Sequence, residues 1–141
     1  MRRFLAPALL TLAFMAGLAG CSSRPALTGL NTEVLSIQHA ADGTLTATIQ
    51  YDNASVLAVN ISHSHHEISL NGRVVGTVDI AEPLGVPSQH NLSQTGTLKL
   101  SGAAPATGEA SYEISSALNV VTYGDSKEIM KFAGSGTVTV K

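Results

Sequence analysis

The sequence predicts an all-β fold, an antiparallel sandwich of about seven strands. Residues 45–51 alternate apolar and polar side chains without a break, which is the period of a half-buried strand. Asn71-Gly72 lies between two apolar segments and is typical of a type I′ hairpin turn, whose two central residues both need a positive φ. We find no convincing amphipathic helix, since the β-branched residues within 54–61 favour a strand there.

The first expected elements follow one another between turn signals. A strand over residues 32–38 is predicted to place Leu35 and Ile37 on one face. Asp42-Gly43 predicts the turn that leads into the strand at residues 45–51.

The second half of the chain continues this pattern of apolar segments and turns. Residues 96–100 and 112–120 are expected strands on either side of a Gly/Ala/Pro loop at residues 102–108. Gly134-Ser135-Gly136 is interpreted as a turn before the last strand, residues 136–140. Strands at this spacing are typical of a sandwich.

The first twenty residues indicate a targeting segment that takes no part in the fold. Arg2 and Arg3 precede an apolar stretch over residues 4–15, which is shorter than the ~20 apolar residues that a membrane-spanning helix needs. The stretch is followed by Leu18-Ala19-Gly20-Cys21, and Cys21 is the only cysteine of the chain. This arrangement resembles the lipobox of bacterial lipoproteins. The alternative is an ordinary secretory signal.

The lipobox resemblance implies a membrane anchor. The signal peptide, residues 1–20, would be removed, and Cys21 would carry a diacylglyceryl thioether and an N-acyl chain. Ser22 follows the cysteine in place of an aspartate, which in a bacterium with two membranes implies sorting to the periplasmic face of the outer membrane. Residues 21–26 are then the acylated N-terminus and tether, and residues 27–141 form the domain.

The composition of the mature chain excludes some partners. Without Arg2 and Arg3, six of the eight basic residues remain against ten acidic ones, a formal net charge of −4. No basic cluster is left, which argues against nucleic acid and against attraction to anionic lipid. The aromatic residues that remain are Tyr51, Tyr112, Tyr123 and Phe132, so the core must be mainly aliphatic.

Several segments, which cover most of residues 30–140, share the pattern of a known family. They are Asp52-Asn53-Ala54-Ser55 and the apolar residues 56–61; Glu67-Ile68-Ser69-Leu70-Asn71-Gly72-Arg73-Val74-Val75-Gly76; Val86-Pro87-Ser88-Gln89-His90-Asn91-Leu92; and Phe132-Ala133-Gly134-Ser135-Gly136-Thr137-Val138. These segments resemble the type 2 late-embryogenesis-abundant (LEA) family, whose domain also occurs in water-stress and hypersensitive-response (WHy) proteins.

The LEA resemblance implies a seven-stranded sandwich of immunoglobulin or fibronectin type III appearance and a non-enzymatic role in stress, often dehydration. Two features depart from the family pattern. The family's Asn-Pro-Asn turn is replaced by Asp52-Asn53-Ala54-Ser55, without a proline, and His63-Ser64-His65-His66 interrupts a plainer alternation.

The histidine cluster is the one candidate for site chemistry. On a strand, His63 and His65 lie on one face and His66 on the other. Two imidazoles at this spacing can share Zn²⁺ or Cu²⁺, with a third ligand from His90 or Glu67. The alternative is a polar, solvent-facing strand before a hairpin.

Catalytic motifs are missing from the sequence. It contains no Gly-x-Ser-x-Gly elbow and no Gly-Lys-Ser/Thr phosphate loop. We therefore expect neither enzymatic activity nor a cofactor. Two function classes remain: an anchored envelope protein that protects or binds partners under desiccation or osmotic stress, and a periplasmic carrier of lipid or another apolar ligand between the sheets.

Overall fold

The structure, a computed structural model, describes residues 29–121 and 125–141, and within them it is all-β. The strands of the described residues are β1 (Leu30–His39), β2 (Leu45–Asn53), β3 (Val59–Leu70), β4 (Arg73–Ile80), β5 (Leu84–Val86), β6 (His90–Leu100), β7 (Gly108–Val121) and β8 (Lys127–Val140). The all-β prediction is confirmed. Tyr123 and Cys21 lie outside the described residues.

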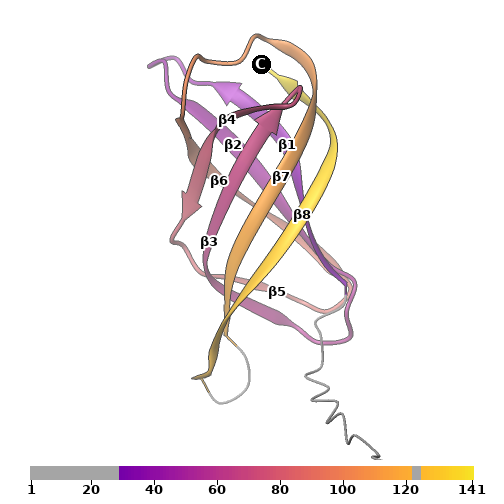
Figure 1. The fold of residues 1–141 in the computed structure, drawn as a ribbon. Coiled ribbons are helices and arrows are strands. Elements are labelled where there is room, and N and C mark those ends of the chain that lie inside the picture. The colour runs from indigo at the N-terminus through magenta and orange to yellow at the C-terminus, as the bar shows by residue number, and fades with distance from the viewer. Residues whose placement is uncertain (1–28, 122–124) are drawn as a thin grey trace, which may run out of the picture.

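Backbone pairing closes seven of these strands into a barrel (Figure 1). Their order is β4-β6-β2-β1-β8-β7-β3, and β3 pairs back with β4, while the short β5 pairs with the start of β3. The closing pair, β1 with β8, is parallel: Ile37 lies opposite Val140, and the Lys141 N–H donates to the Ile37 carbonyl at 2.9 Å. The other pairings are antiparallel.

The predicted antiparallel sandwich of immunoglobulin or fibronectin type III type is therefore wrong. A sandwich keeps two sheets with separate edges, whereas here β4 bridges β3 and β6 and the end of β8 joins β1. Pairing around a ring removes the edges that a sandwich leaves open. The contact between β1 and β8 joins the two ends of the described chain, which local alternation does not encode.

The predicted hairpin is confirmed. Asn71 and Gly72 have φ values of 49° and 78°, as a type I′ turn requires, and Leu70 pairs with Arg73. The Asn71 side-chain oxygen also accepts a hydrogen bond from the Ser111 N–H at 3.0 Å, which ties the turn to β7. The Asp42-Gly43 turn is confirmed as well, with the Thr44 N–H donating to the Asp42 carboxylate at 2.9 Å.

An irregularity in β1 overturns one predicted face. The register with β2 shifts between Val34 and Ser36, so the inward face changes from even to odd residue numbers. Ile37 is fully buried, but Leu35 is 47% exposed on the outside. The expectation that Leu35 and Ile37 share a face is wrong because one residue is inserted at the bulge.

The expected turn at residues 134–136 is also wrong, since these residues continue β8, opposite β7. The two glycines serve close packing. A Cβ on Gly134 would lie 2.7 Å from the Thr32 carbonyl oxygen, and one on Gly136 would lie 3.0 Å from the Tyr112 ring. Because glycine has no side chain, β8 can cross close to β1 at Gly134.

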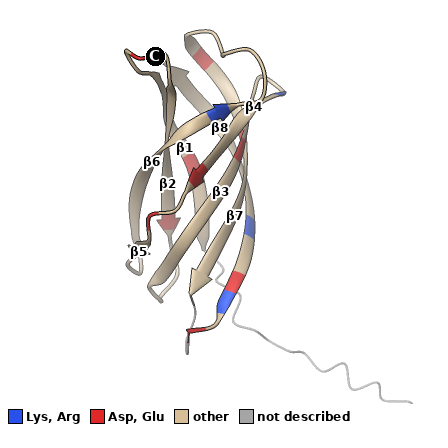
Figure 2. Ribbon diagram, turned by 90° about the vertical axis from the view of Figure 1, so that its left-hand side faces the viewer, with Lys and Arg blue, Asp and Glu red and all other residues tan. Residues whose placement is uncertain are grey.

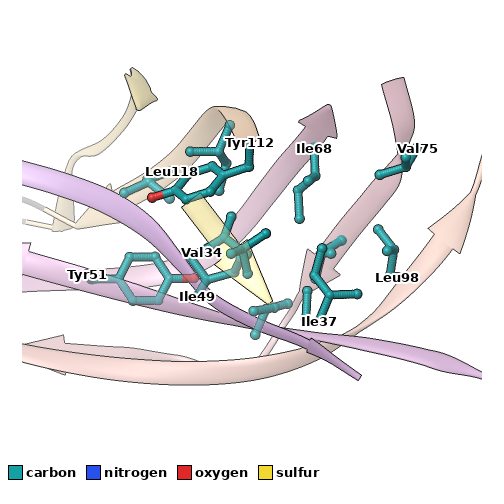
Figure 3. Close-up of a cluster of buried hydrophobic side chains, with 14 of the residues drawn as sticks. Val34, Ile37, Ile49, Tyr51, Ile68, Val75, Leu98, Tyr112 and Leu118 are labelled. Atoms are coloured by element: carbon teal, nitrogen blue, oxygen red, sulfur yellow. The ribbon is translucent and has the colours of Figure 1, made fainter. Parts of the chain in front are cut away.

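The interior is filled mainly by aliphatic side chains, as the composition predicts. Figure 3 shows Val34, Ile37 and Ile49 meeting Ile68 and Leu118 across the barrel. Tyr51 and Tyr112 add aromatic bulk, and Tyr51 is fully buried. Each large side chain buried in this way stabilises the fold by about 1.5–3 kcal/mol.

Asn53, at the end of β2, holds two loops together from a fully buried position. Its amide nitrogen donates to the carbonyls of Leu57 (2.8 Å), Val86 (3.1 Å) and Pro87 (3.1 Å). Its side-chain oxygen accepts from the Ser55 hydroxyl at 2.6 Å and from the Ser55 N–H at 3.1 Å. Asn53 is thus the structural centre of the segment that resembles the LEA turn.

Replacing Asn53 by aspartate should destabilise the protein by about 2–4 kcal/mol, because a buried carboxylate would face three carbonyl oxygens in place of a donor. The free energy of unfolding in urea measures the loss. Asn60→Asp, at an exposed position of β3, is the matched control and should change stability little. Equal losses in the two variants would contradict this role of Asn53.

Candidate functional site

A chain of hydrogen bonds between side chains crosses the barrel interior. The Tyr51 hydroxyl lies 2.8 Å from Ser64 Oγ and 3.0 Å from His66 Nε2. On the other side of the imidazole, His66 Nδ1 lies 2.8 Å from Ser116 Oγ, which lies 2.9 Å from Thr32 Oγ1. All five side chains are at most 2% exposed. We call these five residues the interior polar chain.

The interior polar chain links four strands: β1, β2, β3 and β7. Its members reach the interior because of a bulge in β3. The register of β3 with β7 shifts between Ile61 and His63. Before this bulge the odd-numbered residues Val59 and Ile61 are buried, and after it the even-numbered residues, from Ser64 onward, are buried. Without this extra residue, the alternation set by Ile61 would direct His63 inward instead of His66.

Neutral His66 satisfies the interior polar chain in full. A neutral imidazole has one donor and one acceptor nitrogen, and each hydroxyl can both donate and accept. Each group can therefore donate to the next along the chain from Ser64 to Thr32, or each can donate in the reverse direction. In either case every hydrogen bond has one donor and one acceptor.

Enclosure in the barrel shifts two pKa values. Burial lowers the pKa of His66 from 6.5 to about 4; the nearby His65 lowers it, Asp79 raises it and His63 lowers it. Burial raises the pKa of Tyr51, although the hydrogen bond with Ser64 acts in the opposite direction. Both groups are therefore neutral at pH 7, as their surroundings require.

A Ser–His pair is also the arrangement of nucleophilic catalysis, but the position of this pair does not fit that use. A catalytic serine must contact its substrate. Ser116 and His66 are 2% and 0% exposed, so a dissolved substrate cannot contact either one in this structure. What the interior polar chain does is hold four strands in one register.

The outer face of the same strand carries His63 and His65, the two predicted metal ligands. The register of β3 with β7 is regular from His63 onward, so these two residues share the face opposite to His66. His65 Nδ1 lies 2.6 Å from Asp79 Oδ1 on β4, and the Lys99 ammonium lies 3.4 Å from Asp79 Oδ2. The hydrogen bond from His65, together with Lys99, lowers the pKa of Asp79.

Of the two further ligands considered, Glu67 shares the outer face of β3, whereas His90 begins β6 and its ring nitrogen bonds the Ser88 carbonyl at 2.8 Å. Within residues 29–121 and 125–141, no three His, Cys, Asp or Glu side chains are grouped to hold a metal ion. The contact with Asp79 leaves Nε2 of His65 open, and metal-binding histidines commonly bond a carboxylate through the other nitrogen. The metal site stays a prediction.

The outer face also has two shallow hollows across β3, β7 and β8. The larger has a volume of about 390 Å³ and the smaller about 200 Å³. The larger is lined by Glu67, Ser69, Glu113, Ile114, Ser115, Ala133, Gly134 and Ser135. These hollows open to solvent and differ from the enclosed apolar cavity that the carrier alternative needs.

The ribbon in Figure 2 shows that the positions of Lys and Arg and those of Asp and Glu are scattered over several strands and loops. The predicted lipidation site, Cys21, lies outside the described residues. Among the residues that are described, no helix is long and apolar enough to cross a membrane.

Comparison with solved structures shows a related fold. AT1g01470 from Arabidopsis thaliana superposes with a TM-score of 0.54 at 13% identity, over 80% of this chain and 82% of that one. A protein from Archaeoglobus fulgidus gives 0.44 at 15% identity (81% and 98% covered), and At2g46140.1, described as a candidate LEA protein, gives 0.49 at 10% (78% and 70% covered). At these identities the likeness concerns the fold alone. No family model and no curated protein matches the chain.

The sequence gives one signal for the interior polar chain that our sequence analysis missed. Alternate residues of β7 are buried, and most of them are apolar: Tyr112, Ile114, Leu118 and Val120. Ser116 is the polar residue at one of these buried positions. A polar residue at an inward position needs a partner inside the barrel. The partner, His66, could not be identified, because the β3 bulge determines which histidine points inward.

The depressed pKa of His66 predicts that stability falls in mild acid. Between pH 6.5 and 4 the unfolded chain binds a proton that the folded chain does not, so the free energy of unfolding should drop by about 2 kcal/mol from pH 7 to 5. Urea unfolding across this range measures the slope. His66→Gln should remove most of it and the exposed His39→Gln should not; an unchanged slope in His66→Gln would contradict the assignment.

The metal prediction has a direct test in calorimetry. If the outer histidines form a site, the protein should bind Cu²⁺ or Zn²⁺, and His63→Ala combined with His65→Ala should abolish the binding. His39→Ala, at an exposed position at the end of β1, is the control and should leave binding intact. If the unmutated protein does not measurably bind Cu²⁺ or Zn²⁺, the predicted metal site is wrong.

Proposed function

We propose that this chain is a non-enzymatic, lipid-anchored envelope protein whose LEA type 2-like domain protects or binds partners under desiccation or osmotic stress. The observation that carries the proposal is the occupied interior. The inward polar groups of four strands bond one another, and aliphatic side chains fill the rest. The outer surface and the loops are then the parts of the described chain that meet other molecules.

The location in this proposal rests on the sequence. Leu18-Ala19-Gly20-Cys21 resembles a lipobox, and Ser22 favours the periplasmic face of the outer membrane. The barrel begins nine residues after Cys21, at Leu30, so a short tether would hold it close to the bilayer. Two or more acyl chains suffice for a stable anchor, whereas one chain binds only marginally.

The stress role rests on the segments that resemble type 2 LEA proteins. Two of these segments have clear structural parts: Asn53 joins the loops at one end of the barrel, and Asn71-Gly72 makes the tight turn at the other.

A deletion strain of the native host tests the proposal. Survival after drying and in high salt should fall, and the unmutated gene should restore it. Cys21→Ser should leave the protein in the soluble periplasmic fraction and restore survival poorly, whereas Ser23→Ala, next to the lipobox, should behave as the unmutated protein. Normal survival in drying and salt, together with sensitivity to detergent, would contradict the stress role and favour the carrier.

A further inference from the structure

The loop between β2 and β3, residues 54–58, exposes two apolar side chains. Val56 is 80% exposed and Leu57 is 43% exposed. Val56 and Ile129, at 70%, are the two most exposed large apolar side chains of the described residues. Fixed apolar groups in water are unfavourable, and contiguous ones commonly mark a contact surface.

The loop is held in this conformation by its own hydrogen bonds. The Ser55 hydroxyl lies 2.9 Å from the Leu57 carbonyl and 2.6 Å from the Asn53 side-chain oxygen. The Asn53 amide nitrogen also donates to the Leu57 carbonyl at 2.8 Å. Val56 is therefore presented outward by a bonded loop, with its neighbours on both sides fixed.

The loop lies beside the point where the chain joins the barrel. The Ala54 N–H donates to the Gly29 carbonyl at 2.8 Å, and a Cβ on Gly29 would lie 3.1 Å from the Ser55 nitrogen. Figure 1 shows the start of β1 and the β2–β3 loop together at the lower end of the barrel, where β8 also begins, two residues before Ile129.

The length of the tether restricts which end of the barrel can reach the bilayer. Gly29 is eight residues after Cys21, and eight residues span at most about 29 Å when fully extended. β3, which leads from this end to the hairpin, has twelve residues, which corresponds to about 40 Å along the strand. The end with Gly29 and Val56 is within reach of an anchor at Cys21, and the hairpin end at Asn71 is not.

We propose that the loop at residues 54–58 is a membrane-contacting loop, in which Val56 and Leu57 enter the interfacial layer of the bilayer and orient the barrel with its Gly29 end toward the lipid. This inference rests on the proposed anchoring through Cys21. Two apolar side chains bind a bilayer weakly, but the tether makes the contact intramolecular and raises its effective concentration. The occupant is the lipid surface itself, since the anchor places it there.

The chain contains no tryptophan, so a single introduced indole reports on its own position. Val56→Trp and Val74→Trp, the latter on a 46% exposed residue next to the hairpin, form a matched pair at the two ends of the barrel. The acylated full chain is reconstituted in phosphatidylcholine–phosphatidylethanolamine vesicles with brominated acyl chains. Fluorescence of the Val56→Trp variant should be quenched at least about threefold more than that of the Val74→Trp variant and shifted to shorter wavelength, because only the former indole reaches the interface.

Flotation of the same vesicles distinguishes failure of the anchor from failure of the membrane-contacting loop. If both variants float with the vesicles and the indole at position 56 is quenched no more than the indole at position 74, the membrane-contacting loop is overturned while the anchor stands. If the acylation-competent protein fails to float, the anchor is overturned and the loop with it. Floating protein with selective quenching at position 56, reduced when Leu57→Asn is added to the Val56→Trp variant, supports the proposal.

Discussion

The hydrogen bond between Tyr51 and His66, at 3.0 Å in the barrel interior, is the contact on which the register of the fold depends. A buried imidazole or phenol without a partner costs about 1–3 kcal/mol, so strand registers that separate these groups are penalised. Ser116 and Thr32 extend the same requirement to β7 and β1. The chain holds one cysteine and cannot form an internal disulfide. Polar contacts inside the barrel therefore supply specificity that aliphatic packing, which is non-directional, does not.

The β3 bulge between Ile61 and His63 makes this arrangement available. It allows one strand to bury Ile61 on one side of the bulge and His66 on the other, and it turns His65 toward Asp79 outside. The inner and outer histidines thus differ in environment although they are adjacent in the chain. One imidazole is buried among hydroxyl groups with a depressed pKa, and the other is bonded to a carboxylate at the surface.

Local patterns predicted the features that depend on local conformation. Asn71-Gly72 forms the expected turn, because a positive φ at two successive residues selects those residue types. The bulge that exposes Leu35, and the use of Gly134 for close packing against β1, depend on which strands meet, and the chain encodes that only through tertiary contacts. Closure of the ring through Val140 and Ile37 joins residues about a hundred positions apart, beyond any local alternation. The interior polar chain was missed for the same reason: its members come from four strands.

The two ends of the barrel differ in the loops that they present. At one end, Asn53 fixes the loop that exposes Val56, close to where the chain leaves toward Cys21. At the other end, the Asn71-Gly72 turn bonds to Ser111, and the neighbouring Val74 is 46% exposed, against 80% for Val56. If the first end contacts lipid, as proposed, the second points away from the bilayer and stays open to other molecules. The difference between the two ends of the barrel arises in the loops, because the inner faces of the strands pack against one another.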